Sequence, residues 1–399
     1  MRRRYAAVFL PIILVIIVVT IYLSPEAAAF VYGIVAFLAP LWLPALLAYL
    51  AWPLWLSFMR QRYIAGIPYA VVELVPGPDT PQTPKAMELV FYSLYHRTEI
   101  TPHDFLFGVT RLSWSFEIYV SERGTRFFVR VPRSHLPAFE SRIRAEYHDL
   151  GMYEVRDYAR EIPFHASSMR AVMREFTLAK PDPYPLATYV SREGNDPFAE
   201  MLDELSAGAG EHFLVSYIIR PHQRERTGYF KDPSDSLHAD ASRAIAEILG
   251  ARGELHALPP AQQSLVAAIE AGLRKPSFDC GIRALYIAER RRYDEDRARK
   301  IEGLFSRFGD GTLNEFVSRD PLSRVSFVAK EAFVALPHLS ESHLVELYRR
   351  RAFFTAPYVG PAFVLNTEEL ATIFRLPQSA RGGPAGQGAK LEPPENLPL

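Results

Sequence analysis

Two long uncharged stretches near the amino terminus constrain this chain more than any other feature. No charged residue lies in residues 5–23, and none lies in residues 27–59. A run of roughly 18 or more apolar residues is long enough to cross the hydrocarbon core of a membrane as a helix. Residues 1–62 are therefore predicted to form a transmembrane helical hairpin, with the second span over about residues 30–51 and an interfacial stretch after it.

The basic residues that flank this hairpin predict its orientation. Arginines occupy positions 2–4 before the first stretch, Arg60 and Arg62 follow the second, and the connection between the stretches carries only Glu26. Lys and Arg are enriched on the cytoplasmic side of membrane proteins. The prediction is a two-pass protein of the cytoplasmic (inner) membrane, with both termini and everything after Tyr63 inside.

A cleaved secretory signal peptide is the alternative interpretation. The arginines at 2–4 resemble the basic region of such a peptide, and the alanines at 27–29 resemble its cleavage site. The apolar core exceeds the usual length of roughly 7–15 residues, however, and a second apolar stretch follows at once. Even after cleavage, the second span would leave most of the chain on the cytoplasmic side. The sequence has a single cysteine, Cys280, which also suits a reducing compartment.

Length and composition limit the number of domains and the kinds of partner expected for the part that follows the hairpin. The chain has 399 residues, so this part is long enough for two ordinary domains. Lys plus Arg number 45 and Asp plus Glu also number 45, so the net charge gives no global field that would favour nucleic acid or an acidic substrate.

The order of expected elements predicts an α+β fold. Residues 63–160 read as strand, helix, strand, strand, helix, strand, which is typical of a split βαβ or ferredoxin-like unit. Residues 161–336 repeat this order loosely, with a helical insertion at about residues 235–275. We expect two ferredoxin-like units, each burying its own core between one sheet face and two helices.

Several segments carry more specific signals. Thr83 precedes Pro84 and is predicted to cap a helix. Residues 294–308 are predicted to form an amphipathic helix, and residues 325–333 the strand that follows it.

The last part of the chain changes in character. Residues 337–377 are predicted to form C-terminal helices, one of them with Thr367 as its N-cap. Residues 378–399 are rich in Gly and Pro and are predicted to be a flexible tail.

Motifs that carry chemistry are missing from the sequence. It contains neither the phosphate loop Gly-x-x-x-x-Gly-Lys-Ser/Thr nor His-Glu-x-x-His, and its 11 histidines show no metal-ligand spacing. Cys280 lies in an apolar strand beside Phe278 and Ile282, which favours an inert buried thiol. We therefore predict no catalytic, cofactor-binding or metal-binding residue, no cofactor, and no enzyme activity.

Two arginine triplets are the candidate contact residues for nucleic acid or a protein partner: Arg290, Arg291 and Arg292, and Arg349, Arg350 and Arg351. The competing interpretation is a solvated surface. Acidic residues at 294–296 follow the first triplet, and Glu346 precedes the second.

Three segments together resemble one protein family. They are PQTPKAMELVFYSLY after the hairpin and first strand, the strand pair SFEIYVSERGTRFFVRVP, and FVLNTEELATIFRLP with the closing EPPENLP. They resemble the amino-terminal region of membrane-anchored proteins related to conjugative DNA-transfer and type IV secretion ATPases. The resemblance implies a domain of unassigned function, followed in typical members by a linker and a RecA-like motor with a phosphate loop.

The departure from that family is as informative as the match. The sequence stops at the linker-like residues 393–398, so no catalytic residue carries over, and the motor is expected to be encoded separately, lost or cut away. The resulting hypothesis is a non-enzymatic membrane anchor or assembly component of a type IV secretion-like or conjugative system. Its expected partners are membrane lipid, a separate P-loop ATPase or secretion-system subunits, and further copies of itself. A membrane-tethered nucleic-acid-binding module is the alternative.

Overall fold

The computed structural model describes residues 25–78, 80, 83–96, 100–192, 196–223, 236–250, 258–321, 340–355, 358–377 and 389–390. These residues belong to two compact units, Met1–Leu56 and Ser57–Leu399. The first expected span, residues 5–23, lies outside the described residues, as does the strand expected over residues 325–333.

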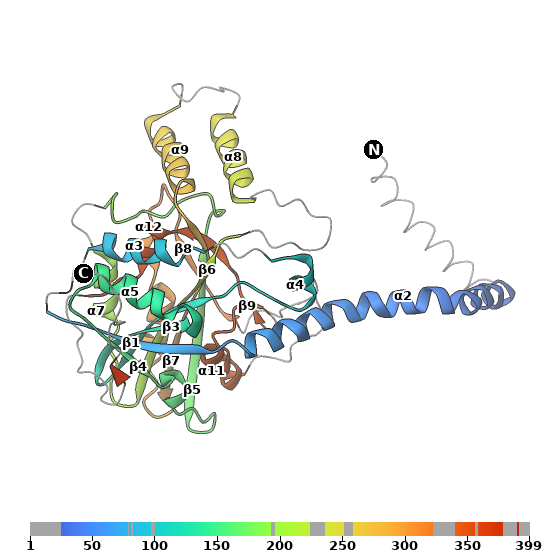
Figure 1. Cartoon of the computed structure of the whole chain (residues 1–399), viewed down its shortest axis with the longest axis horizontal. Coiled ribbons are helices and arrows are strands. Elements are labelled where there is room, and N and C mark those ends of the chain that lie inside the picture. The colour runs from blue at the N-terminus through green and yellow to red at the C-terminus, as the bar shows by residue number, and fades with distance from the viewer. Residues whose placement is uncertain are drawn as a thin grey trace. The chain divides into compact units, whose positions relative to one another are not determined.

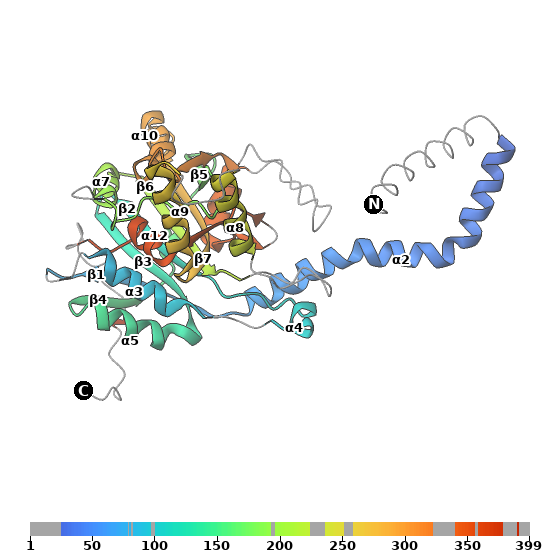
Figure 2. The ribbon, with the colours of Figure 1, turned by 90° about the horizontal axis from the view of Figure 1, so that it is seen from above.

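Helix α2 (Pro25–Ala65) contains the second apolar stretch. Its segment Tyr32–Ala65 is long and apolar enough to cross a membrane. Large apolar side chains of this helix are exposed, Phe37 for example by 84%. The helix is curved (Figure 2) and continues through Pro40 and Pro53 to Ala65, past residue 51, where the predicted second span ends.

The second unit is built on one large antiparallel sheet (Figure 1) with the strand order β12-β4-β1-β3-β2-β6-β7-β5-β8, and β11 also pairs with β7. The strands are β1 (Tyr69–Pro76), β2 (Trp114–Ser121), β3 (Gly124–Pro132), β4 (Leu150–Val155), β5 (Met169–Leu178), β6 (Glu211–Pro221), β7 (Ser277–Glu289), β8 (Phe316–Arg319), β11 (Phe363–Asn366) and β12 (Ala389–Lys390). Two short strands, β9 (Phe354–Thr355) and β10 (Tyr358–Val359), pair with each other. The described structure is therefore α+β, with one long apolar N-terminal helix.

Strands β2 and β6 join the two halves of this sheet. They pair antiparallel from Trp114 opposite Ile219 to Val120 opposite Phe213. On one side of the join the order is β4-β1-β3-β2, and on the other side it is β8-β5-β7-β6. Because the two halves share a ladder of hydrogen bonds, their inner faces form one continuous apolar surface.

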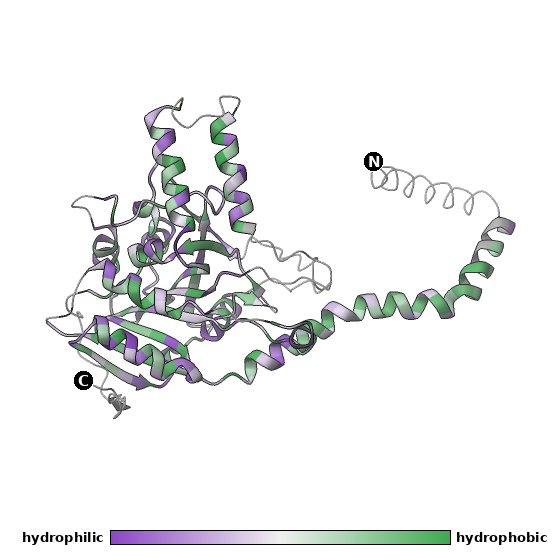
Figure 3. Ribbon diagram, turned by 45° about the horizontal axis from the view of Figure 1, so that its top comes forward, coloured by the Kyte–Doolittle hydropathy of each residue, from purple (hydrophilic) through white to green (hydrophobic). Residues whose placement is uncertain are grey.

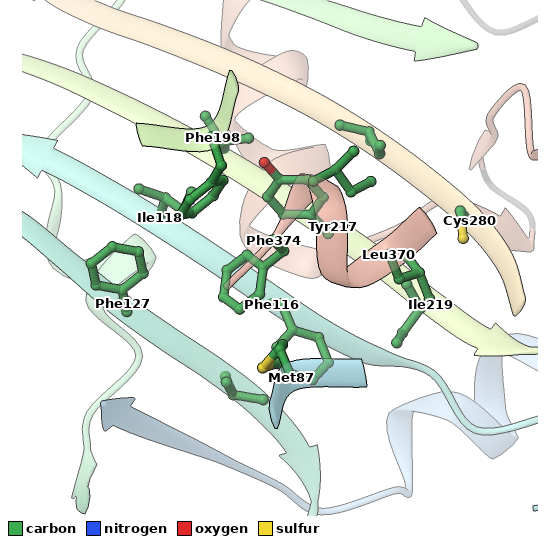
Figure 4. Packing of buried hydrophobic residues seen from close by; sticks show 14 of the residues in the cluster. Met87, Phe116, Ile118, Phe127, Phe198, Tyr217, Ile219, Cys280, Leu370 and Phe374 are labelled. Carbon is green, nitrogen blue, oxygen red and sulfur yellow. The ribbon is translucent and has the colours of Figure 1, made fainter. Parts of the chain in front are cut away.

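Helices cover one face of the sheet and enclose the main core. They are α3 (Pro84–Leu94), α5 (Leu136–Glu146), α7 (Pro197–Glu204), α10 (Glu295–Lys300) and α12 (Thr367–Ile373). Phe374, just after α12, lies at the join, with its ring centroid 5.2 Å from that of Phe116 on β2 and 5.3 Å from that of Tyr217 on β6 (Figure 4). The expectation of one core per unit is wrong, because a single buried cluster runs across both halves.

The opposite face of the sheet is covered by α6 (Tyr158–Glu161) and α11 (Glu341–Arg350). Side chains alternate between the faces of a strand, so each strand presents a different set of residues here. On β2, Phe116 and Ile118 point into the main core, whereas Glu117 and Tyr119 face the second layer. This second face carries buried charges, and they form the site described below.

Three local expectations need correction. The N-cap of α12 is Asn366, whose side chain accepts hydrogen bonds from the backbone N–H groups of Glu368 and Glu369, and Thr367 is already inside the helix. The helix expected over residues 294–308 is α10 followed by short 3₁₀ turns. Within the expected flexible tail, β12 (Ala389–Lys390) pairs with β4.

Two expected helices are present between β6 and β7. They are α8 (Ser236–Leu249) and α9 (Pro260–Leu273), and they pack against each other (Figure 1). Short α4 (Pro102–Leu106) lies in the connection between α3 and β2.

Candidate anion-binding site

A buried ion pair between Arg351 and Glu117 lies on the second face of the sheet. Arg351 donates from Nε and one terminal nitrogen to the two carboxylate oxygens of Glu117, at 2.8 and 2.9 Å, and also pairs with Asp157 at 2.6 Å. Ser115 and Tyr158 donate further hydrogen bonds to Glu117, at 2.5 and 2.7 Å. Burial disfavours the charge, but the two carboxylates outweigh it and raise the pKa of Arg351 well above its usual value.

Arg351 adopts an unusual backbone conformation because it ends a helix. It is the C-cap of α11, with φ at 51° in the left-handed region that favours glycine. A side chain other than glycine is held there at some cost in strain. The bidentate contact with Glu117 offers a reason for an arginine at this position.

A second charged cluster surrounds Asp279 near the start of β7. The carboxylate of Asp279 accepts from Arg220 and Arg111, both at 2.9 Å, and contacts the ring Nδ1 of His222 at 2.5 Å. Burial raises the pKa of Asp279, but the hydrogen bond from His222 and the two arginine charges outweigh burial, so the net shift is downward. Asp279 therefore stays ionised and orients both arginines.

The segment after α11 closes over this face through Phe353. The ring of Phe353 lies against Gly281 on β7 and Gly360, where an added Cβ would come within 2.3 and 2.5 Å of ring carbons. Arg283 stacks over the same ring, with its guanidinium carbon 4.9 Å from the centroid, and pairs with Glu175 at 3.3 Å. Glycine is required at both positions because only a hydrogen leaves room for the ring.

Between these clusters lies a cavity of about 820 Å³. Its walls come from the end of α2, the start of β1, and the segments around residues 110–113, 154–160 and 349–355. Two carboxylates line it, Glu154 and Asp157, against eight arginines: Arg111, Arg130, Arg156, Arg160, Arg220, Arg349, Arg350 and Arg351. The lining is strongly cationic although the whole chain has no net charge.

Two of these arginines form no ion pair with any described residue. Arg130 lies half-buried on β3, with its guanidinium carbon 3.4 Å from the ring centroid of Tyr69, and burial lowers its pKa. Arg156 is exposed at the rim. Planar guanidinium groups bind phosphate and carboxylate oxygens in pairs of parallel hydrogen bonds, so this cavity suits an anion.

Of the two arginine triplets expected as contact residues, one lines the cavity. Arg349, Arg350 and Arg351 line the cavity, although Arg349 already donates to the carbonyls of Ala159 and Ile162 at 3.1 and 2.8 Å. Arg290, Arg291 and Arg292 follow the end of β7, where Arg290 donates to the carbonyl of Ala166 at 2.8 Å and Arg292 donates to that of Ala209 at 2.7 Å. None of these three residues lines the cavity.

Sequence reasoning missed the other arginines of the cavity because they are dispersed along the chain. Arg111, Arg130, Arg156 and Arg220 come from separate segments. One signal was available: in β3, Arg126 and Arg130 alternate with apolar residues of the core face, which marks the opposite face as charged.

Candidate metal ligands are not clustered in the described part of the chain. No group of three or more His, Cys, Asp or Glu there could hold a metal ion. Cys280 is fully buried, and burial raises the pKa of its thiol well above the usual value, as expected of an inert thiol.

Comparison with known proteins assigns the chain to a family. A family model described as a domain of unknown function, DUF8128, matches residues 70–383, which is most of the chain. The chain belongs to the DUF8128 family. The DUF8128 region begins in β1 and extends past α12, so it includes both halves of the sheet. No curated protein matches the chain.

Proposed function

We propose that this DUF8128 protein is a membrane-anchored, non-enzymatic assembly component that holds its partners at the cytoplasmic membrane face. The observation that carries the proposal is the direct connection between helix and sheet. Helix α2 ends at Ala65 and β1 begins at Tyr69, so three residues join the apolar helix to a central strand of the sheet. Such a short connection favours an anchor that limits the movement of the sheet, in contrast to an anchor joined by a long flexible linker.

Contacts at the end of α2 support the same proposal. Gly108, which follows α4, has φ at +74°, and an added Cβ would lie 2.3 Å from the backbone of Met59. Arg60 lies over the ring of Phe105, 5.5 Å from its centroid. The last turns of the helix are thus in contact with the segment around α4.

Type IV secretion-like or conjugative DNA transfer is the proposed setting, on the strength of the sequence resemblance. The partner would be a separate P-loop ATPase or another secretion subunit, and the chain itself could assemble with further copies. The paired helices α8 and α9, which mix apolar and polar residues (Figure 3), offer a surface for such contacts.

We propose further that the two halves of the sheet are two ferredoxin-like units, the second with α8 and α9 inserted. The support is the shared strand order, β4-β1-β3-β2 and β8-β5-β7-β6, which is antiparallel in each half. In each half, helical segments connect the first strand to the second (α3 and α4, or α7) and the third to the fourth (α5, or α10 with its 3₁₀ turns).

The proposed two-pass topology can be tested by cysteine labelling, because the one native cysteine is buried. Glu26→Cys and Arg291→Cys would each be treated in intact cells with a membrane-impermeant maleimide. We expect Glu26→Cys to react from outside and Arg291→Cys to react only after permeabilisation. Labelling of Arg291→Cys in intact cells would reverse the proposed orientation.

The non-enzymatic role and the partner need separate measurements. Crosslinking in cells, followed by purification of the full chain in mild detergent, is expected to recover a P-loop ATPase. ATP hydrolysis by the purified chain alone, persisting through repurification, would contradict the non-enzymatic role.

A nucleic-acid-binding module is the second candidate, and the arginine-lined cavity with exposed Arg156 and Arg350 at its edge favours it. Base stacking on the sheet has no support, since Phe116 and Phe127 are buried in the core. Titration of single- and double-stranded DNA at two salt concentrations tests this candidate, because phosphate contacts weaken steeply with salt.

A further inference from the structure

The cationic cavity adjoins the end of the apolar helix. Gln61, Ile64 and Ala65 of α2 form part of its wall. The last residue of the uncharged stretch is Met59, and a helix rises about 1.5 Å per residue, so Gln61 lies roughly 3 Å further along the axis. If α2 is the membrane anchor, the cavity wall begins at the level of the lipid headgroups.

A neighbouring loop supports this placement. Phe107 follows α4 and is 52% exposed, while Phe105 in α4 contacts Arg60 near the end of α2. Amphipathic and aromatic side chains commonly lie at the headgroup level of a membrane. The cavity and an exposed aromatic side chain therefore lie near the same end of the helix.

The charge of the cavity fits one phosphate group better than a polymer. Arg351 is neutralised by Glu117 and Asp157, and Arg349 donates to backbone carbonyls. Arg130 and Arg156 are the lining arginines that form no ion pair within the described part of the chain. Arg130 is also held in place by stacking on Tyr69, so it would lose little conformational freedom on binding an anion. A nucleic acid would need a longer row of such cations.

We propose that this cavity binds the phosphate-bearing headgroup of an anionic phospholipid from the membrane that α2 enters, with Arg130 and Arg156 contacting the phosphate. A cavity of about 820 Å³ has room for a phosphate and its glycerol or polyol. The bound lipid would fix the orientation of the sheet at the membrane surface. This inference rests on the proposed anchor role of α2, which carbonate extraction of membranes tests by itself.

The binding test uses the full chain in a nonionic detergent. Thermal unfolding would be followed while dihexanoyl phosphatidylglycerol, dihexanoyl phosphatidylcholine or inorganic phosphate is added, since a ligand of the folded state raises the unfolding temperature. We expect phosphatidylglycerol to bind at least about tenfold more tightly than either other probe. The substitutions Arg130→Gln and Arg156→Gln are each expected to weaken it about tenfold or more, as loss of a charge-assisted hydrogen bond does.

A matched control separates a specific site from general charge attraction. Arg291→Gln removes the same charge from an exposed position at the far end of β7 and is expected to leave the affinity unchanged. Arg156→Gln keeps the test valid if Arg130→Gln fails to fold, because Arg156 is exposed.

Four results would overturn the proposal. They are equal weakening by Arg291→Gln, no effect of Arg156→Gln, equal affinity for phosphatidylcholine, and equal affinity for inorganic phosphate, which would make free phosphate the ligand. Displacement of the lipid by a single-stranded oligonucleotide that also depends on Arg130 would instead favour the nucleic-acid module. If the chain resists carbonate extraction while lipid binding fails, the anchor role survives and only this inference falls.

Discussion

Removing Arg351 should destabilise the second unit more than removal of any exposed arginine. The side chains of Arg351 and Glu117 are 1% and 0% exposed. Breaking a buried pair by deleting one partner costs about 3–5 kcal/mol, because the remaining charge is left without compensation. In Arg351→Met, Glu117 would keep only the hydroxyl donors of Ser115 and Tyr158. We expect a loss of stability of about 3–5 kcal/mol.

The native cysteine supplies the assay for this prediction. Cys280 is fully buried in β7, so a maleimide reaches it only when the sheet opens. When opening and closing are fast relative to labelling, the rate follows the open population, and each 1.4 kcal/mol changes it about tenfold. Arg351→Met should therefore accelerate labelling of Cys280 roughly 100- to 4,000-fold in membranes that contain the full chain.

Three further variants make this prediction refutable: Arg350→Met, Glu117→Gln, and Glu117→Gln combined with Arg351→Met. Arg350→Met removes a neighbouring arginine that is exposed and paired with Glu346, so its effect should stay within about 0.5 kcal/mol. The double variant Glu117→Gln with Arg351→Met should recover part of the loss, because no charge is left uncompensated. The reasoning fails if Arg351→Met behaves like Arg350→Met, or if the double variant loses the full sum of the single effects.

Three smaller predictions follow; thermal unfolding at each pH tests the first, because the reaction of a thiol with maleimide itself depends on pH, and the labelling assay tests the other two. Burial raises the pKa of Glu369 to about 7 from the ordinary 4.5. The folded carboxyl therefore keeps a proton that the unfolded chain has lost, so wild-type stability should fall as pH rises from about 4.5 to 7. Glu369→Gln should remove this dependence of stability on pH. Gly281→Ala should destabilise by about 1–3 kcal/mol, since its Cβ would meet the ring of Phe353, whereas an unchanged labelling rate would show that the ring can move. Asn366→Ala should lower stability by about 1 kcal/mol, because the N-cap of α12 is lost. Thr367→Val should be neutral or stabilising, because the buried Thr367 hydroxyl has no hydrogen-bond partner in the described structure. A greater loss of stability in Thr367→Val than in Asn366→Ala would identify the threonine as the cap.

Prediction from sequence succeeded where the signal is local. The strand pair expected in SFEIYVSERGTRFFVRVP forms the hairpin of β2 and β3, and Pro84 marked the start of α3. One error arose where two neighbouring residues offered the same local chemistry. Asn366 and Thr367 are both good N-caps, and only the backbone geometry selected Asn366.

The candidate site was predicted only in part for a related reason. The triplet Arg349 to Arg351 was visible as a run of like charges, yet the sequence assigned it the same role as the triplet at 290–292. Arg130 lacked any such local signal. Its position in the cavity depends on Tyr69, which is far from it in the chain and lies opposite Pro132 in the pairing of β1 with β3.

The sequence by itself determined the long apolar helix, the α+β class and the order of most strands and helices, because periodicity, charge and capping act between residues a few positions apart. Only the tertiary structure decided that β2 pairs with β6, so that two halves share one core, and that arginines from distant segments line one cavity beside the end of α2. Strand pairing across such separations depends on which edges meet and which faces are buried, and no short stretch of sequence contains that information.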